Sequence, residues 1–202
     1  MSGPDRADRG DRRRTALLEA LDELLQEHPL AQIKIADISH RAGVTRSAFY
    51  FYFDSKAIAV AALMSEVYDE RFVATTLLRA EDETPQARIE AGLRAMFDVV
   101  TERAHLHRAL GDARNTDATV RALWDADRSS FVGPIVELID AERAAGNAPT
   151  GPDAAALATL LLELNDRVLE RVARGSELDV RPQLDAVIAI WLRSIYGSGG
   201  AA

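Results

Sequence analysis

The segment between Ile33 and Lys56 constrains the fold of this 202-residue chain more than any other part of it. It holds the pair Gly43-Val44, and five consecutive aromatic residues, Phe49 to Phe53, follow a few positions later. Glycine readily takes a left-handed backbone conformation, so it can end one helix and turn the chain into the next. The segment therefore predicts two short helices, residues 36–42 and 45–53, joined by a tight turn.

The second of these helices has two unlike faces. At about 100° per residue, Phe49 and Phe53 share the face that points to a core. The outward face and its flanks carry Arg46, Ser47, Ala48, Tyr50, Phe51 and Tyr52. A short helix with an arginine, small residues and tyrosines directed outward suits the major groove of DNA. The alternative is that the aromatic residues only pack a small helical domain, but an outward phenylalanine beside an outward tyrosine is hard to explain by packing.

Each outward residue has a chemistry that DNA can use. Arg46 can reach guanine edges or a phosphate, and Ala48 is small enough to touch a thymine methyl group. Hydroxyl groups can donate to phosphates, and a lysine at the start of a helix adds charge beside free backbone N–H groups. The residues that we expect to contact DNA are Lys34, Thr45, Arg46, Ser47, Ala48, Tyr50, Phe51, Tyr52 and Lys56.

Charge is divided unevenly along the chain. The formal net charge of −8, taken alone, suits an ordinary acidic protein. Residues 1–56 hold 9 Lys and Arg against 9 Asp and Glu, a balance of zero, whereas residues 57–202 hold 15 against 23. The acidic excess therefore lies in the second part, which is compatible with a DNA-binding N-terminal domain followed by an acidic partner domain.

The first residues of the chain interleave arginines with aspartates. Arg6, Arg9 and Arg12–Arg14 can reach along a DNA backbone or into a minor groove. Because Asp5, Asp8 and Asp11 alternate with them, a solvated tail is an equal alternative. We expect four regions: a disordered arm over 1–11, a helix-turn-helix domain over 12–56, a second domain over 57–196 and a flexible tail over 197–202.

The remainder of the chain has helical period and no strand signals, so we predict an all-α fold of about nine helices. Start signals predict one long helix from Asp54 or Ser55 to about Leu78, and another that begins at Thr84-Pro85. Further helices are expected near residues 105–112, 120–145, 152–174 and 182–196. The helix over 120–145 contains Gly133-Pro134, which should interrupt it.

The last two expected helices are apolar on more than one face. Leu157, Leu161 and Leu164 mark one face and Leu160 another, and Ile190 stands apart from the main stripe of the final helix. A helix that is apolar on two faces has to be covered on two faces. We predict that the second face meets another copy of the chain in a four-helix bundle. A centrally buried helix in a monomer is the alternative.

The motifs of the first domain resemble the DNA-binding domain of TetR-family transcriptional regulators. The shared pattern consists of Ile38, the run Ala42–Thr45, the run Tyr50–Phe53 and the pair Ser55-Lys56. Two C-terminal motifs, IDAERAAG at 139–146 and WLRSIYG at 191–197, are similar to those of the ethionamide-resistance regulator subgroup. Positions 47, 48 and 51 depart from the usual family residues, so the resemblance does not transfer an operator sequence.

The resemblance implies a C-terminal domain that encloses a small apolar ligand and forms a homodimer. The ligand would favour a dimer whose reading helices are wrongly spaced for successive major grooves, and so release operator DNA. Asn165 lies among apolar residues, where an unpaired amide is costly, so it should bond a ligand or a neighbouring backbone group. The residues expected to line the ligand site are Leu93, Met96, Phe97, Val100, Leu123, Trp124, Phe131, Leu161, Leu164, Asn165 and Val168.

No motif points to catalysis, so we expect a repressor and not an enzyme, with no cofactor and no catalytic or metal-binding residues. His105 and His107 stand two positions apart, which separates them by about 200° on a helix and argues against a shared metal site. The chain has no cysteine, and no apolar run approaches the roughly 20 residues that span a membrane, so we expect a cytoplasmic protein. A helical adaptor without ligand control is the alternative function.

Overall fold

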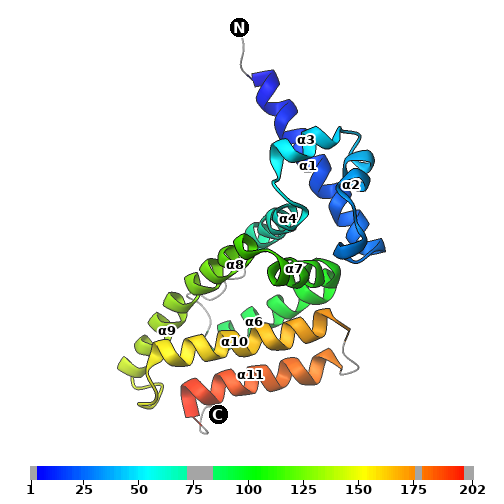
Figure 1. Ribbon diagram of the computed structural model, residues 1–202. Coiled ribbons are helices and arrows are strands. Elements are labelled where there is room, and N and C mark those ends of the chain that lie inside the picture. The colour runs from blue at the N-terminus through cyan, green and yellow to red at the C-terminus, as the bar shows by residue number, and fades with distance from the viewer. Residues whose placement is uncertain (1–3, 72–83, 176–178, 198–202) are drawn as a thin grey trace. The chain divides into compact units, whose positions relative to one another are not determined.

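The computed structural model describes residues 4–71, 84–175 and 179–197, and all regular structure in these ranges is helical (Figure 1). The predicted all-α fold is confirmed. The elements are α1 (Pro4–Glu27), η1 (Leu30–Gln32, a 3-10 turn), α2 (Ile35–Arg41), α3 (Arg46–Tyr52), α4 (Lys56–Arg71), α6 (Pro85–Glu102), α7 (Ala104–Thr116), α8 (Ala118–Ser130), α9 (Val132–Ala144), α10 (Ala154–Ala173) and α11 (Val180–Tyr196). Only Phe131 separates α8 from α9, and these two helices correspond to the single interrupted helix that we predicted over residues 120–145.

The helix boundaries follow the local signals. Thr84 and Asp153 each accept a hydrogen bond from the backbone N–H three residues later, at 3.2 and 2.9 Å, and so cap α6 and α10. The predicted interruption between α8 and α9 lies at Phe131, three residues before Pro134. Proline has no N–H to donate and its ring clashes with the carbonyl four residues earlier, so Pro134 is accommodated in the first turn of a new helix.

The chain divides into two compact units. Unit 1 comprises Met1–Glu70 and His105–Ala122, and unit 2 comprises Arg71–Ala104 and Leu123–Ala202. The boundary expected after residue 56 therefore differs from the observed one, because α4 and α7 belong with the N-terminal helices. Two polar contacts tie α7 and the residue after it to unit 1: His105 Nε2 lies 2.7 Å from Asp22 Oδ1, and Ser55 Oγ donates to Asp117 Oδ2 at 3.3 Å.

Two further boundaries differ from those expected. Helix α1 begins at Pro4, so most of the arm that we expected to be disordered is helical backbone continuous with the rest of α1. Helix α4 reaches Arg71, and the predicted extension to Leu78 lies outside the described residues.

The interior of unit 1 is built by apolar side chains from α1, α2, α3, α4 and α7. Leu17 and Leu21 of α1, Phe49 of α3 and Leu106 of α7 are each at most 1% exposed. Beyond this core the N-terminal turns of α1 continue past α3 (Figure 1). Helix α1 is therefore longer than the part of it that packs in this core.

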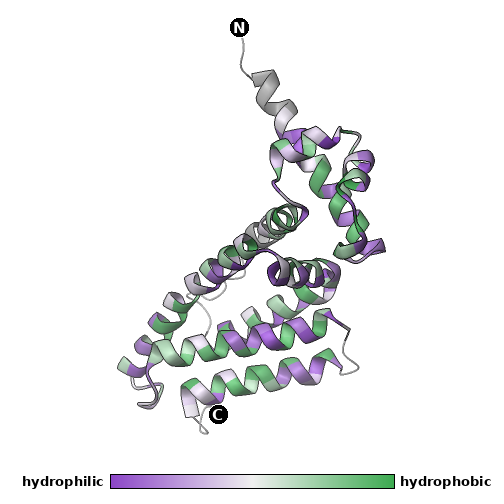
Figure 2. Ribbon diagram, in the orientation of Figure 1, coloured by the Kyte–Doolittle hydropathy of each residue, from purple (hydrophilic) through white to green (hydrophobic). Residues whose placement is uncertain are grey.

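The core of unit 2 lies between α6, α9, α10 and α11, and α10 packs against the other three. Helices α10 and α11 lie side by side (Figure 1). Phe97 of α6, Ile139 of α9, Leu161 of α10 and Trp191 of α11 are buried in one continuous apolar cluster. Hydrophobic and hydrophilic residues alternate in bands along α10 and α11, as Figure 2 shows.

Candidate DNA-reading surface and ligand-binding interior

The turn between α2 and α3 has the geometry that the sequence predicts. Gly43 has a φ of +65°, a conformation that side chains with a Cβ rarely adopt. Thr45 then caps α3, since its Oγ1 accepts from the backbone N–H of Ala48 at 3.2 Å. These two residues set the angle between the short helices of a helix-turn-helix.

The two faces of α3 are as unlike as predicted. Phe49 and Phe53 are 0% and 3% exposed, whereas Tyr50 is 46% and Phe51 is 81% exposed. Arg46 and Ser47 are exposed as well, and Ala48 and Tyr52 are half-buried on the flank. The outward residues therefore form one contiguous surface, which we name the reading face: Arg46, Ser47, Tyr50 and Phe51.

Contacts between neighbours hold the reading face in a defined arrangement. The Arg46 guanidinium donates to the Tyr50 hydroxyl at 3.2 Å and lies 5.6 Å from the centre of its ring. The rings of Phe51 and Tyr52 meet edge to face at 5.0 Å. Side chains that are already ordered lose less conformational entropy when they bind a partner.

Lys34 is the residue that immediately precedes the first turn of α2. Lys34 is exposed, and its backbone N–H donates to Asp37 Oδ2 at 3.0 Å. A lysine cannot cap a helix with its side chain, so the carboxylate of Asp37 supplies the local bond instead. The ammonium group is left at the helix start, where we expected it to meet a phosphate.

Lys56 occupies a different position from the one we expected. Its Nζ donates to the carbonyl oxygens of Leu30 at 2.7 Å and Ile33 at 2.9 Å, and lies 3.5 Å from that of Ala31. The ammonium group is thus directed into unit 1, where it satisfies carbonyls at the end of η1. In place of the predicted phosphate contact, Lys56 makes hydrogen bonds that anchor α4 to the segment before α2.

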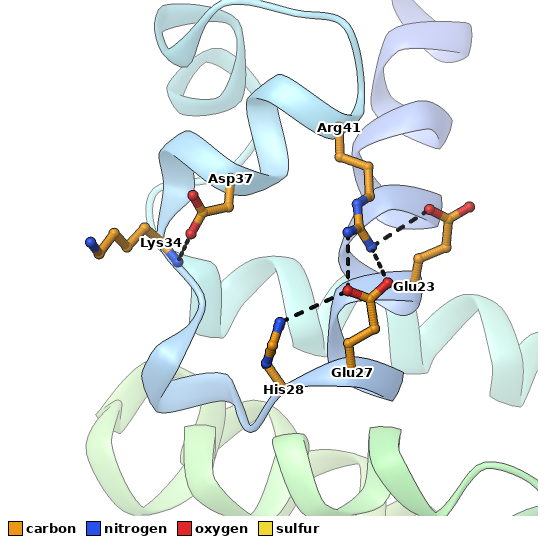
Figure 3. A network of polar contacts seen from close by, with 6 residues as sticks. All are labelled: Glu23, Glu27, His28, Lys34, Asp37 and Arg41. Atoms are coloured by element: carbon orange, nitrogen blue, oxygen red, sulfur yellow. Dashed lines mark hydrogen bonds and ion pairs between the residues drawn. The ribbon is translucent and has the colours of Figure 1, made fainter.

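A polar network joins α2 to α1 (Figure 3). Arg41 binds both carboxylate oxygens of Glu27, at 2.7 and 3.1 Å, and approaches Glu23 at 3.9 Å. These hydrogen bonds lower the pKa of Glu27 and raise that of Arg41. A cavity of about 380 Å³ adjoins this network and is lined by Leu24, His28, Gln32, Ile33, Asp37, His40 and Arg41. Five of its seven lining residues are polar, so it does not match the apolar ligand expected from the sequence.

Most of the residues predicted to line a ligand site lie in the interior of unit 2. Those buried in the core are Leu93, Phe97, Val100 and Leu161, and those packed at its margin are Met96, Phe131 and Val168. Leu164 and Trp124 are half-buried, and Leu123 is 54% exposed. Leu123 therefore lies at the surface, although it stands only about 60° around α8 from the buried side chain of Val120.

Asn165 is the polar group that the sequence singled out in this interior, and it is 2% exposed. Its Oδ1 accepts a hydrogen bond from the indole Nε1 of Trp191 at 3.0 Å. The partner is thus a side chain of α11 and not the backbone group that we considered. The bond satisfies the amide oxygen.

Two polar clusters in unit 2, one half-buried and one buried, were missed from the sequence. Arg128 of α8 donates to the carbonyl of Leu162 at 2.9 Å and forms an ion pair with Asp166. Glu142 and Tyr196 are 8% and 6% exposed, and burial, followed by the charge of Glu142, raises the pKa of Tyr196. Glu142 and Tyr196 belong to the two C-terminal motifs, and that membership was the available signal for their pairing.

Leu160 of α10 and Ile190 of α11 are exposed apolar residues, at 63% and 44%. They lie on the second apolar faces that the sequence assigns to a dimer. Among the described residues, no helix is both long and apolar enough to cross a membrane, and no three potential metal ligands cluster.

Comparison with known proteins agrees with this architecture. The family model for bacterial regulatory proteins of the tetR family matches residues 17–63, and that for the C-terminal domain of the transcriptional regulator EthR matches residues 89–197. The HTH-type transcriptional regulator EthR of Mycobacterium tuberculosis is 33% identical over 192 residues, which cover 93% of this chain and 89% of the relative.

Solved structures share the fold. A TetR transcriptional regulator from Rhodococcus sp. RHA1 is 26% identical, with a TM-score of 0.61 over 90% of this chain and 96% of that one. FadR of Thermus thermophilus, a TetR-family repressor solved with lauroyl-CoA, is 18% identical, with a TM-score of 0.70 over 94% and 98%. The chain therefore belongs to the TetR family of bacterial transcriptional regulators and, through its C-terminal part, to the EthR group within it.

Proposed function

We propose that this protein is a cytoplasmic repressor that binds operator DNA as a homodimer and releases it when a small apolar molecule binds in unit 2. The observation that carries the DNA-binding part is the reading face. Phe51, which is 81% exposed beside an exposed tyrosine and arginine, is not part of the hydrophobic core. Aromatic and methyl contacts with thymine, and arginine contacts with guanine, are what such a face offers in a major groove.

Each member of the reading face has a proposed task. Arg46 reads a guanine edge or holds a phosphate, while Phe51 packs on thymine methyl groups. Ser47 and Ala48 allow close approach, and the hydroxyls of Thr45, Tyr50 and Tyr52 donate to phosphates together with the ammonium of Lys34. One short helix reads few base pairs, so two copies on neighbouring grooves are needed for a specific site.

The experiment for DNA binding is selection of fragments from the protein's own genome, followed by gel-shift titration of the enriched duplex. Arg46→Ala should weaken binding about tenfold, because one good contact to a base is worth about 1–3 kcal/mol. Arg94→Ala is the matched control, because Arg94 is an exposed arginine on α6 in unit 2. Equal losses in both variants would contradict a specific role for the reading face.

The ligand proposal rests on the interior of unit 2. Its walls are apolar, and Asn165 brings one amide group into them, which suits an apolar molecule with a single hydrogen-bonding group. The complex of Thermus thermophilus FadR with lauroyl-CoA supports a search among molecules with long acyl chains. A ligand that releases DNA has to bind the incompetent state more tightly than the competent one.

Two measurements test this second part. Addition of acyl-chain compounds to the operator complex should lower the gel-shift affinity and raise the unfolding temperature of the free protein. No change in either quantity across a broad apolar library would contradict ligand control while leaving DNA binding intact.

Leu160→Glu and Ile190→Glu should convert the dimer to monomers in sedimentation analysis if α10 and α11 form the interface.

A further inference from the structure

Arg46 and Tyr50 of the reading face form a pair whose geometry is supported from the core. They stand one turn apart on α3, so their side chains meet on the same face of the helix. Nη2 of Arg46 donates to the hydroxyl oxygen of Tyr50 at 3.2 Å, and the guanidinium lies 5.6 Å from the centre of the tyrosine ring. That ring meets Phe49 edge to face at 5.7 Å, and Phe49 is 0% exposed. A buried residue therefore restrains Tyr50, and Tyr50 restrains Arg46.

A guanidinium that is held in one orientation suits a base edge better than a phosphate. Phosphate oxygens accept hydrogen bonds from many directions, whereas the O6 and N7 acceptors of guanine lie in the plane of the base and take two donors in that plane. Arginine has five N–H groups, of which Tyr50 uses one, so a pair of parallel donors is still available. An arginine that is restrained before binding also loses less rotamer freedom when it binds.

The place of Arg46 along the chain agrees with contact to a base. It is the first residue of α3, directly after the Thr45 cap. In helix-turn-helix proteins the N-terminal residues of the second helix are those that contact base edges. Tyr50 lies one turn further along, where its hydroxyl can accept from Arg46 and still donate its own hydrogen.

We propose that Tyr50 is a positioning residue that directs Arg46 onto the O6 and N7 edge of a guanine. Each half-site of the operator then carries a guanine opposite the start of α3. This inference rests on the proposed DNA binding, and it decides between the two tasks that remain open for Arg46 there. Base recognition becomes a property of the Arg46–Tyr50 pair, and Arg46 is assigned no phosphate.

The test uses the full-length protein and the duplex enriched from its own genome. Each base pair is exchanged in turn, and gel-shift affinities give the preference for the selected base at every position. Wild-type protein should prefer one guanine per half-site about tenfold over other bases, and Arg46→Ala should abolish that preference and no other. Replacement of this guanine by 7-deazaguanine, which pairs normally but lacks the N7 acceptor, should weaken binding by the wild type and leave Arg46→Ala unaffected.

Tyr50→Phe keeps the aromatic ring and removes only the hydroxyl. It should lower the preference for this guanine about twofold to tenfold, because the net contribution of one hydrogen bond corresponds to a factor of that size. A ratio between bases cancels any loss that is the same for all sequences, such as a lost phosphate contact. Tyr52→Phe is the matched comparison, since it removes the same hydroxyl from the same helix. It should lower the affinity for all sequences alike and leave every base preference unchanged.

The double variant Arg46→Ala with Tyr50→Phe tests whether Tyr50 acts through Arg46. In the absence of a guanidinium, removal of the Tyr50 hydroxyl should have no further effect on the preference at this position. A purely structural role of Tyr50 would lower the unfolding temperature and would not change the preference at one position selectively.

The outcomes separate this inference from the proposed DNA binding. An unchanged guanine preference in Tyr50→Phe would overturn the role of Tyr50 and leave the reading face as a DNA-binding surface. The same holds if Arg46→Ala keeps every base preference and the magnitude of its salt slope falls by about 0.9 per protomer, since Arg46 would then hold a phosphate. Absence of sequence-selective binding by the wild type would overturn the proposed operator recognition, and the inference with it.

Discussion

Two phenylalanines on different helices illustrate how differently the two proposed binding sites are built. Phe51 of α3 is 81% exposed, whereas Phe97 of α6 is 1% exposed. Leaving an aromatic ring in water forgoes the stabilisation that burial would give, about 2–3 kcal/mol for a phenylalanine. Burial of an aromatic ring such as that of Phe97 is, by contrast, ordinary for a hydrophobic core.

Exposure therefore marks the DNA-reading surface, and burial does not mark a ligand site. The apolar residues in the interior of unit 2 can equally be ordinary core residues, because hydrophobic cores and ligand pockets have the same apolar composition. The feature that departs from packing there is polar: Asn165, 2% exposed and bonded to Trp191. In each unit, the residue that indicates function lies in an environment that is unfavourable for its side chain: Phe51 lies in solvent and Asn165 lies in an apolar interior.

The largest expected contrast is within α3 itself. Phe49→Ala removes a ring that is 0% exposed, and should lower the free energy of unfolding by about 3–5 kcal/mol. Phe51→Ala removes a ring in solvent, and should change it by less than about 0.5 kcal/mol while weakening operator binding about tenfold. Urea titration and gel shift measure the two quantities. Comparable destabilisation by both changes would refute the division into a core face and a reading face.

Unit 1 also contains a largely buried histidine, His107, so the effect of burial in this unit can be tested by changing the pH. Burial, and then the charge of His105, lowers the pKa of His107 from 6.5 to about 4. Between these values the unfolded chain takes up a proton that the folded protein refuses, so acid favours unfolding. Stability should be complete above about pH 7 and decline by on the order of 2–3 kcal/mol as the pH falls to about 4.

Thermal melts between pH 4 and 8 measure this effect. His107→Leu should flatten the pH dependence, because the substituted side chain cannot bind a proton in either state. His28→Leu is the control, since the side chain of His28 is 53% exposed and its removal should leave the slope in place. A steep acid transition that persists in His107→Leu would assign it to other groups.

The sequence predicts unit 1 in more detail than unit 2 because its signals are local. Gly43, Thr45 and the spacing of Phe49 and Phe53 determine a turn, a cap and a face within a dozen residues. The helical start of α1 escaped prediction because alternating Arg and Asp give no apolar stripe.

Long-range pairings were beyond the reach of local patterns. Lys56 occupies a motif position, but its carbonyl partners lie 23–26 residues earlier along the chain. Asn165 called for a partner, yet nothing in the sequence identifies Trp191, which is 26 residues later. Such contacts are decided by how helices pack, so they appear only in three dimensions.

Lys56 sharpens the distinction between residues that touch DNA and residues that position those that do. Lys56→Met keeps the aliphatic stem but leaves carbonyls of η1 without their donor, which should cost about 2 kcal/mol in unfolding free energy. The salt dependence of DNA binding should stay within experimental error of the wild type, whereas Lys34→Met should lower its magnitude by about 0.9 per lost contact. A reduced slope in Lys56→Met would restore the phosphate contact that the geometry replaces.

The smallest expected effect concerns the polar bond inside unit 2. Trp191→Phe retains an aromatic ring but removes the indole N–H, so the buried oxygen of Asn165 loses its donor, at a cost of about 1 kcal/mol. Asn165→Leu combined with Trp191→Phe removes both partners and should recover part of that loss in urea titration, because no buried polar atom is then left unpaired. If the amide also binds the ligand, the double variant alone should fail to release operator DNA when an effective acyl-chain compound is added. Release that is unchanged in the double variant would leave Asn165 as a packing residue without a role in ligand binding.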